Sequence, residues 1–356
     1  MDAFFAAIEE RDKPRLKGLP IVVGADPKNG QGRGVVSTAN YKARKYGIHS
    51  AMPISQAWRL SEEAKRNGKP KVTFMGGNFS RYHEVSENVV AIIKKYAAVV
   101  ERASIDEVYL DLSFTGNFQK AKNLCEKIKN EIKKKEQLTC SIGIGPNKLI
   151  AKIAADFKKP DGLTIVGSDD EKTCAELTEA FLEPLPIRKI PGIGPKTEET
   201  FKKLGIKNVG DLKKFSHEEL KKMMGKWGIE LYEKIRGRDN TPVTEEYEVK
   251  SIGEQETFPK DTKDLNFLSE RLGDLSQSVF RRFKTSDFKT YKTLVLTVRF
   301  DDFETKSRSH TLNEPAADLK TIRFEALRLL LPFLDKRDNP KQKLIRLLGV
   351  RIEKLL

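Results

Sequence analysis

Two adjacent carboxylates at the start of an apolar strand are the feature that most restricts how this chain can fold. Asp106 and Glu107 come directly before Val108-Tyr109-Leu110, and a second β-rich stretch, residues 98–102, lies just upstream. Because neighbouring strand residues point to opposite faces, both carboxylates reach one point only where the strand begins or bends. Carboxylate oxygens held on a sheet suit a hard cation such as Mg²⁺. A solvated strand end produces the same pair, so the rest of the chain has to separate the two interpretations.

Length and charge restrict the class of protein. At 356 residues the chain exceeds one ordinary domain, and roughly two to four domains are expected. Lys and Arg number 66 against 51 Asp and Glu, a formal net charge of +15. This excess favours a polyanionic partner, nucleic acid above all. A generally basic surface that serves solubility is the alternative.

Cysteine and histidine usage argues against a disulfide framework and a zinc site. The three cysteines, Cys125, Cys140 and Cys174, are widely spaced, and the four histidines are scattered. This pattern fits a reducing cytosol. The sequence has no apolar run of transmembrane length and no signal peptide. It therefore predicts a cytoplasmic protein without a membrane partner.

The order of predicted elements indicates a multi-domain α/β (α+β) protein. Strands alternate with amphipathic helices as far as residue 159, residues 170–237 are predicted to be wholly helical, and turn formers at 236–242 predict a linker before a second α/β region. Strands are predicted at residues 21–23, 35–37, 140–144, 291–300 and 343–352. Helices are predicted at residues 41–46, 79–96, 118–135, 148–158 and 318–331.

Three further motifs have a possible binding role. Residues 190–196, Ile-Pro-Gly-Ile-Gly-Pro-Lys, have the pattern of a helix-hairpin-helix whose backbone amides cradle phosphate, although an ordinary helix–helix turn also favours glycine. Tyr41 and Arg44 share one helix face and suit a triphosphate tail, or form a solvated basic helix. Lys152 interrupts an apolar helix face, and points either outward or into a polar site.

Several of these segments occur together and in a defined order, and a further one follows the linker. They are Ala39–Arg44, Ser104–Glu107, Asn147–Lys152, Pro191–Gly194 and Lys250–Gly253. In this set and order the chain resembles Y-family translesion DNA polymerases of the DinB type, over nearly its whole length. The resemblance implies a right-hand polymerase fold. Its parts would be a palm (1–3 and 73–159), fingers (4–72), a helical thumb with the helix-hairpin-helix (160–237), a linker (238–246) and a C-terminal little finger (247–356).

The resemblance implies error-prone, template-directed DNA synthesis past damaged bases, with two Mg²⁺ ions per active site and no proofreading. Asp106 and Glu107 would be the catalytic metal ligands. Nucleotide contacts would come from Phe5, Thr38, Tyr41, Arg44 and Lys152, with Phe5 as the steric gate that excludes a 2′-OH. Ala25 and Val35 would roof the nascent base pair. DNA contacts would come from Gly192, Gly194, Lys196, Ser251, Gly253, Lys306 and Arg308.

Lys306 and Arg308 belong to an alternating run, Thr305–Thr311, and are expected to share one strand face near a row of phosphates. An edge strand protected by charge is the alternative. The expected partners are primer-template DNA and deoxynucleoside triphosphates, with affinity for DNA that falls steeply with salt. A sliding clamp is a further candidate, although its binding peptide is not seen before Leu356. The protein is expected to be a monomer.

The start of the chain departs from the family pattern. The family begins with an apolar strand ending Asp-x-Asp-x-Phe-Phe/Tyr, whereas this chain begins Met1-Asp2-Ala3-Phe4-Phe5. Met1 then takes the middle place, and Asp2 matches the second acid, whose family role is not metal ligation. We expect the bridging carboxylate and one palm strand to be missing. The chain is then either a fragment begun at an internal Met or a crippled, non-catalytic DNA-binding paralogue. A helix-hairpin-helix nuclease or glycosylase has little support, because no further catalytic group occurs near residues 190–210.

Overall fold

The computed structural model describes residues 1–246 and 248–356, which form two compact units. The first unit comprises Met1–Ala25, Val35–Met52 and Gln56–Glu246. The second comprises Asp26–Gly34, Pro53–Ser55 and the described part of Tyr247–Leu356. The predicted first residue of the C-terminal domain, Tyr247, lies outside the described residues. Within the described ranges, no helix is both long and apolar enough to cross a membrane.

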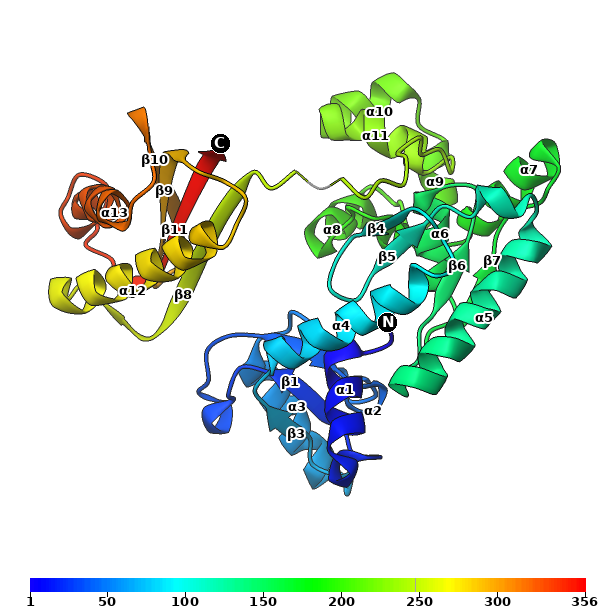
Figure 1. Cartoon of the computed structure of the whole chain (residues 1–356), viewed down its shortest axis with the longest axis horizontal. Helices are drawn as coiled ribbons and strands as arrows, with labels where there is room; N and C mark the ends of the chain where they lie inside the picture. The colour runs from blue at the N-terminus through cyan, green and yellow to red at the C-terminus, as the bar shows by residue number, and fades with distance from the viewer. Residues whose placement is uncertain (247) are drawn as a thin grey trace. The chain divides into compact units, whose positions relative to one another are not determined.

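The N-terminal part of the first unit contains a small mixed sheet (Figure 1). Its strands are β1 (Ile21–Gly24), β2 (Val36–Ala39) and β3 (Thr73–Met75), in the order β2-β1-β3. β1 is antiparallel to β2 and parallel to β3. The helices of this part of the sequence are α1 (Phe4–Asp12), α2 (Tyr41–Arg44) and α3 (Ile54–Arg66). The predicted strands at 21–23 and 35–37 are thus confirmed to within a few residues, and the predicted helix at 41–46 is one short turn.

Asn40 makes the change from β2 to α2 abrupt. Its side-chain oxygen accepts the N–H of Ala43 and the N–H of Ile21, each at 3.0 Å, while its amide nitrogen donates to the carbonyl oxygen of Leu19 at 2.8 Å. A helix N-cap of this kind contributes about 1 kcal/mol. Because the cap is buried and makes three hydrogen bonds, the first helical residue, Tyr41, has a defined position.

The middle of the first unit alternates helices with two separate pairs of strands. The elements are α4 (Phe79–Ile93), β4 (Val100–Arg102), β5 (Val108–Leu110), α5 (Phe118–Glu136), β6 (Ile142–Ile144), α6 (Lys148–Ala155) and β7 (Leu163–Ile165). β4 pairs with β5 antiparallel, and β6 pairs with β7 parallel. Asparagine caps the N-terminus of each helix, at Asn78, Asn117 and Asn147. These caps set helix starts that agree with the predicted ones.

The segment after residue 170 is helical, as predicted. It contains α7 (Glu171–Leu182), α8 (Pro195–Lys203), α9 (Val209–Lys213), α10 (His217–Met224) and α11 (Lys226–Lys234). Phe201, Leu220 and Leu231 are completely buried in its core. Polar side chains that bond backbone N–H groups cap α9 and α10 at Asn208 and Ser216, so short helices succeed one another without a sheet.

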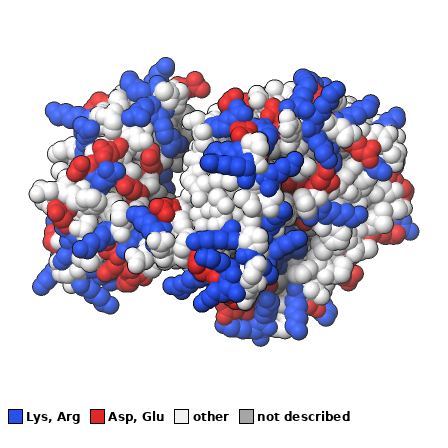
Figure 2. All heavy atoms as spheres, turned by 90° about the horizontal axis from the view of Figure 1, so that it is seen from below, with Lys and Arg blue, Asp and Glu red and all other residues white. Residues whose placement is uncertain are grey.

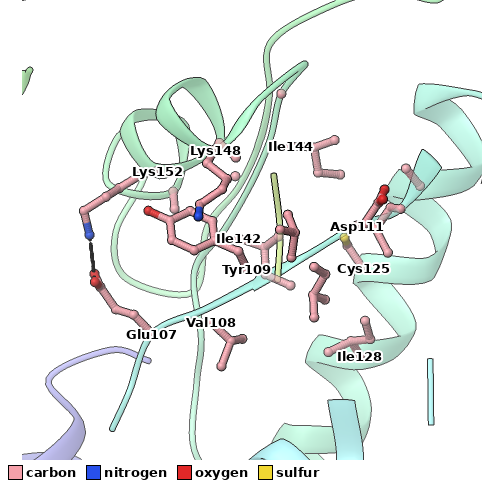
Figure 3. Close-up of a pocket in the computed structure, with 18 of the residues that line it drawn as sticks. Glu107, Val108, Tyr109, Asp111, Cys125, Ile128, Ile142, Ile144, Lys148 and Lys152 are labelled. Carbon is pink, nitrogen blue, oxygen red and sulfur yellow. Dashed lines mark hydrogen bonds and ion pairs between the residues drawn. The ribbon is translucent and has the colours of Figure 1, made fainter. Parts of the chain in front are cut away.

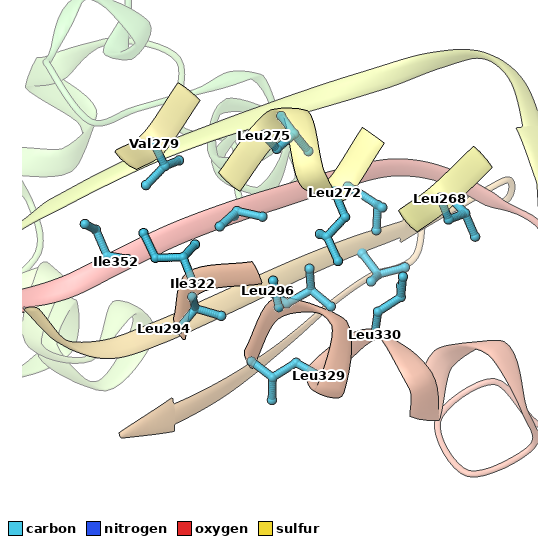
Figure 4. Close-up of a cluster of buried hydrophobic side chains, with 14 of the residues drawn as sticks. Leu268, Leu272, Leu275, Val279, Leu294, Leu296, Ile322, Leu329, Leu330 and Ile352 are labelled. Carbon is cyan, nitrogen blue, oxygen red and sulfur yellow. The ribbon is translucent and has the colours of Figure 1, made fainter. Parts of the chain in front are cut away.

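The second unit is an antiparallel sheet covered by two helices. Its elements are β8 (Ser251–Thr262), α12 (Leu265–Lys284), β9 (Tyr291–Phe300), β10 (Thr305–Ala316), α13 (Leu319–Leu334) and β11 (Ile345–Leu355). The strand order is β10-β9-β11-β8, which leaves β10 at one edge. Leucine, isoleucine and valine side chains from both helices and the sheet form one core (Figure 4). The predicted strand at 291–300 is confirmed with the same bounds.

The register of β10 decides which face Lys306 and Arg308 occupy. They lie opposite Val298 and Leu296 of β9, whose side chains belong to the core beneath the helices. Directly opposed residues share a face, so both cations point to the side covered by α12 and α13. The prediction that they share one face is confirmed. Both side chains contact Asp338, which follows α13 in the sequence. Lys306 Nζ donates to the Asp338 carbonyl oxygen at 2.8 Å, and the Arg308 guanidinium lies 3.0 Å from the Asp338 carboxylate.

Truncating Leu296 tests this core. Its side chain is completely buried, and we expect Leu296→Ala to lower the free energy of unfolding of the second unit by about 3 kcal/mol. Leu265→Ala is the matched control, because Leu265 is 47% exposed, and it should change that free energy by about 0.5 kcal/mol or less. Urea unfolding followed by circular dichroism measures both variants. Equal stability of the two would show that the core is not packed as described.

Candidate active site

Asp106 and Glu107 lie in a tight turn that leads into β5. Ser104 shapes this turn: its hydroxyl oxygen accepts the N–H groups of Asp106 and Glu107, at 3.3 and 3.1 Å, and its hydroxyl donates to Asp106 Oδ1 at 2.9 Å. The N–H of Ala103 donates to the carbonyl oxygen of Glu107 and closes the hairpin. Both acids therefore precede the first strand residue, Val108, which is the position from which two neighbouring carboxylates reach the same space.

Lys152 points into the polar site and not outward, which settles the alternative left open by the sequence. Its ammonium group lies 2.7 and 2.8 Å from the two carboxylate oxygens of Glu107 (Figure 3). The side chains remain 31% and 41% exposed, respectively. A pair this accessible contributes little to stability, because water competes for both charges. Lys152 is therefore free to exchange Glu107 for another anion.

A second lysine of α6, Lys148, forms a similar ion pair, which the sequence did not predict. Lys148 Nζ lies 2.6 and 2.7 Å from the carboxylate oxygens of Glu101, and 5.1 Å from the centre of the Tyr109 ring. Burial, followed by the negative charges of Glu107 and Glu101, raises the pKa of Tyr109 to about 12. The pair joins α6 to β4, elements far apart in sequence, so no local pattern could have indicated it.

The Asp2 carboxylate has a structural role, because it links the start of the chain to two distant segments. Asp2 is 3% exposed, and its two carboxylate oxygens accept the hydroxyl of Ser141 and the backbone N–H of Asp161, each at 2.8 Å. The amino group of Met1 donates to the carbonyl oxygen of Asp106 at 2.6 Å. The first residues of the chain are therefore joined to the acidic turn and to the segments next to β6 and β7.

Tyr41 and Arg44 share one face of α2, as predicted. Arg44 Nε donates to the carbonyl oxygen of Ala39 at 2.9 Å, and its guanidinium carbon lies 4.8 Å from the centre of the Tyr41 ring. The Tyr41 hydroxyl is buried and makes no well-formed hydrogen bond in the part of the chain that the structure describes. Burial, followed by the negative charge of Asp2, raises its pKa. Thr38, at the end of β2, is also buried.

The two N-terminal phenylalanines have different environments. Phe4 is 2% exposed and belongs to the core. Phe5 is half-buried and stacks on Tyr82, with the ring centres 4.5 Å apart and the planes 14° from parallel. The Tyr82 hydroxyl in turn donates to Glu9 at 2.6 Å, which fixes the ring beneath Phe5. Phe5 therefore presents a flat, supported surface.

Ala25 and Val35 lie next to each other at the ends of β1 and β2. The N–H of Ala25 donates to the carbonyl oxygen of Val35 at 3.2 Å. Val35 is 48% exposed, which is unusual for an apolar residue beside a sheet. The two small side chains therefore form a low apolar surface.

A cavity of about 680 Å³ begins at the acidic turn. Glu107, Lys148 and Lys152 line its polar end, and apolar residues such as Ile128 and Ile142 line its other wall (Figure 3). β5 and β6 both border it, and in the described residues each of them pairs with a strand on one edge only. Burial raises the pKa of two wall cysteines, Cys125 and Cys140, to about 12 and 11, which makes both thiols poor nucleophiles.

The glycines of the helix-hairpin-helix pattern have different roles. Gly192 has a φ of 101°, which favours glycine, and the space that a Cβ would take lies 3.4 Å from the indole of Trp227. Gly194 has ordinary extended backbone and is the N-cap of α8. Lys196, in the first turn of this helix, is exposed. The predicted turn is present, with its glycines at the start of α8.

Ser251 and Gly253 lie on β8, on the sheet face opposite the helices. Gly253 pairs with Arg351 of β11, and a Cβ at Gly253 would lie 2.9 Å from the Arg351 side chain. The missing side chain therefore leaves room for Arg351, which is about half exposed. Sequence reasoning did not single out this arginine, because only the register of two distant strands places it beside Gly253.

Asp106 and Glu107, which both line the cavity, offer carboxylate oxygens as donors for a metal ion. Among residues 1–246 and 248–356, no group of three or more His, Cys, Asp and Glu stands close enough together to hold a metal ion. Hard cations such as Mg²⁺ need few protein carboxylates when phosphate and water supply the other oxygens. The pair therefore fits a cation that is bound jointly by protein and a phosphate-bearing ligand.

Three regions of the chain match known family models. Residues 1–156 match the impB/mucB/samB family, residues 188–239 match a model described as DNA polymerase-iota, thumb domain, and residues 249–356 match the impB/mucB/samB family C-terminal domain. The matches follow the same order as the motifs.

Curated relatives and solved structures agree with these models. DNA polymerase IV 2 of Methanosarcina mazei is 43% identical over 356 residues, which cover 100% of this chain and 90% of the relative. DNA polymerase IV of Listeria monocytogenes is 39% identical, with 100% and 93% covered. A Y-family DNA polymerase chimera, Dbh-Dpo4(243-245)-Dbh, has a TM-score of 0.84 at 29% identity, with 100% of this chain and 97% of that chain covered. An insertion ternary complex of Dbh DNA polymerase has a TM-score of 0.64 with the same identity and coverage.

Proposed function

This chain belongs to the Y family of DNA polymerases, of the DNA polymerase IV type, and we propose that Asp106 and Glu107 form the catalytic centre of its nucleotidyl transfer. Its function is template-directed DNA synthesis past damaged bases. The observation that carries the proposal is the pair of carboxylates held in the Ser104 turn, with Lys152 beside them. The non-catalytic alternative has less support, because relatives named DNA polymerase IV match the whole chain.

We propose two Mg²⁺ ions as the cofactors, and Asp106 and Glu107 would hold them together with the triphosphate. When bound, the ions supply activation of the primer 3′-OH and neutralisation of charge at the α-phosphorus. Ser104 keeps the Asp106 carboxylate oriented, and the Asn147 cap positions α6 so that its lysines face the acids. The protein would thus contribute the carboxylates of Asp106 and Glu107, with the ammonium group of Lys152 next to Glu107.

Lys152 is suited to the leaving group. We propose that an incoming triphosphate displaces Glu107 from Lys152, which frees the carboxylate for a cation and places the ammonium where negative charge develops. Tyr41 and Arg44 would donate hydrogen bonds to the same phosphates. The Tyr41 hydroxyl, which makes no well-formed hydrogen bond among the described residues, would then gain an acceptor. Thr38 would contribute from the end of β2. The exposure of the Lys152–Glu107 pair supports this exchange.

The base and sugar of the nucleotide would lie against apolar surfaces. We propose that Ala25 and Val35 roof the nascent base pair, because two small side chains leave space for a bulky or damaged template base. Phe5 would lie beneath the sugar. Its stacking on Tyr82 supports a rigid floor.

We further propose the division into palm (1–3 and 73–159), fingers (4–72), thumb (160–237), linker (238–246) and little finger (247–356). The three family matches, at 1–156, 188–239 and 249–356, support a break between residues 156 and 188 and another between residues 239 and 249, and they do not bear on the boundaries between palm and fingers. We propose that the protein acts in the cytoplasm as a monomer, and a sliding clamp remains a predicted partner.

DNA and deoxynucleoside triphosphates are the substrates of the family, and we propose a primer-template duplex as the bound form of DNA. The start of α8, with Gly192, Gly194 and Lys196, would hold phosphates, and Ser251 and Gly253 would do so on the open face of the second unit. Lys306 and Arg308 would contact DNA from the edge strand after exchanging Asp338 for phosphate. Figure 2 shows Lys and Arg side chains over much of the face in view, with smaller groups of Asp and Glu, which supports binding to a polyanion.

Primer extension tests the catalytic proposal. The assay compares the 356-residue chain with a form extended at its N-terminus by an apolar strand that ends in Asp, each with Mg²⁺ and with a chelator. We expect template-directed, Mg²⁺-dependent extension, and a higher rate for the extended form, because a further carboxylate would add an anionic oxygen donor to the site. Failure of both forms to make Mg²⁺-dependent product would refute the catalytic proposal.

The salt dependence of binding tests the phosphate contacts. We expect the logarithm of the affinity for primer-template to fall linearly with the logarithm of salt concentration, and Lys196→Ala to reduce that slope by about 1. Fluorescence anisotropy of labelled DNA gives both values. Lys203→Ala is the matched control, because Lys203 is exposed at the other end of α8 and should leave the slope unchanged. A flat salt profile, or equal effects of the two variants, contradicts the assignment.

A further inference from the structure

The outer face of α13 carries a row of exposed apolar side chains. Phe324, Leu327 and Leu331 are 64%, 38% and 43% exposed, respectively. Their spacing is i, i+3 and i+7, so they lie along one face of the helix. Continuous apolar rows of this kind on a protein surface mark interaction sites more often than single exposed residues do.

The fold does not require this row. The core contacts of α13 come from its other face, where Ile322, Leu329 and Leu330 belong to the core of the second unit (Figure 4). These inner residues are at most 8% exposed. The helix is therefore apolar on two sides, although only one of them stabilises the second unit. An apolar second side is typical of a helix that is covered on both faces.

Basic side chains flank the apolar row, and α13 itself contributes no exposed acid to it. Lys320, Arg323 and Arg328 are exposed on the same side of the helix. The only acid of α13, Glu325, is 6% exposed and is paired with Arg328 at 2.7 Å and with His310 at 3.0 Å. The outer face of α13 thus presents apolar and positive groups together.

We propose that this face, made of Phe324, Leu327 and Leu331 with Lys320, Arg323 and Arg328, binds an acidic amphipathic helix of a partner protein. Apolar anchors at helical spacing match the row, as in other helix-on-helix recognition. Glutamate or aspartate side chains of the partner helix, on both sides of its apolar anchors, would form ion pairs with Lys320, Arg323 and Arg328. Such pairs fix the orientation of the partner and speed the encounter.

The same observations disfavour other occupants. Nucleic acid would engage the cations through phosphate and leave the apolar row without a matching surface. A second copy of this face would bring Lys320, Arg323 and Arg328 toward the same cations, in a chain of net charge +15. An acidic apolar helix satisfies both parts of the surface at once.

The test uses the full chain and a fluorescein-labelled 18-residue peptide with Leu at positions spaced three and four apart and Glu at most others. We expect saturable binding, measured by anisotropy, that weakens at high salt. Phe324→Ser combined with Leu331→Ser should weaken it at least tenfold, and Arg323→Glu at least fivefold. Leu265→Ser, an exposed leucine of α12, should leave it unchanged. These side chains are exposed, so equal melting temperatures should show that all the variants are folded.

Several results would overturn the proposal. Equal binding of a peptide with the same composition in scrambled order would do so, as would the absence of saturable binding. Self-association of the unmodified chain in analytical ultracentrifugation that is lost in the Phe324→Ser form would assign the face to a second copy. Binding to anionic lipid vesicles that is lost in the same form would assign it to a membrane surface.

Discussion

Replacing Asp106 with Asn is expected to lower the rate of Mg²⁺-dependent primer extension at least about a thousandfold, equivalent to roughly 4 kcal/mol of transition-state stabilisation. Asn keeps the size of the side chain and the oxygen that accepts the Ser104 hydroxyl at 2.9 Å. The turn should therefore persist, and only the negative charge is lost. Single-turnover primer extension measures this change in rate. The assay uses the given chain or its N-terminally extended form, whichever is the faster enzyme.

Asp111→Asn is the matched control. Asp111 lies at the other end of β5, borders the same cavity, and accepts the N–H of Ser113 at 2.9 Å. It stands outside the acidic turn, so we expect a change in rate of about twofold or less. DNA affinity should be the same in both variants. If Asp106→Asn remained as active as Asp111→Asn, the catalytic centre would have to lie elsewhere.

Replacing Phe5 with Ala is expected to raise ribonucleotide incorporation, relative to deoxyribonucleotide incorporation, at least about tenfold. The factor corresponds to roughly 1.4 kcal/mol of relieved steric overlap with a 2′-OH. The reason is the rigid position of the ring, which stacks on Tyr82 and meets Phe79 edge-on with the ring centres 5.8 Å apart. Single-nucleotide incorporation with matched ribo- and deoxynucleotides gives the ratio.

Phe79→Leu separates a direct gate from a loss of packing. Phe79 is 59% exposed and supports Phe5 only from its edge, so its replacement should leave sugar selection nearly unchanged. Phe5→Leu, which keeps apolar volume but removes the flat ring, should give an intermediate ratio. Unchanged selection in Phe5→Ala, or the same change in Phe79→Leu, would remove Phe5 from the gate.

Much of the site could be predicted because its signals are local. The acidic turn, the Tyr41–Arg44 helix face and the glycine turn before α8 each depend on residues within a few positions of one another. Buried caps such as Asn40 make such short-range rules decisive, since a buried side chain bonded to the first turn favours one helix start. The predicted strand at 291–300 succeeded for the same reason, as a run of β-branched and apolar residues between polar turns.

Contacts across the fold could not be predicted. The sequence left Lys152 with two directions, and only the packing of α6 beside the Glu107 turn chose between them. The Lys148–Glu101 pair and the place of Arg351 beside Gly253 had no local signal. The face of Lys306 and Arg308 was predicted as shared, but the register of β10 against β9 was needed to show that it is the side covered by the helices.

The sequence by itself determined the order of helices and strands, the acidic turn and the family, because these depend on the periodicity and chemistry of neighbouring residues. The tertiary structure alone decided which cation meets which carboxylate, which sheet face stays open, and that α13 keeps a second apolar side exposed. Those outcomes depend on the packing of segments far apart in the chain, and local sequence patterns do not specify which distant segments come into contact.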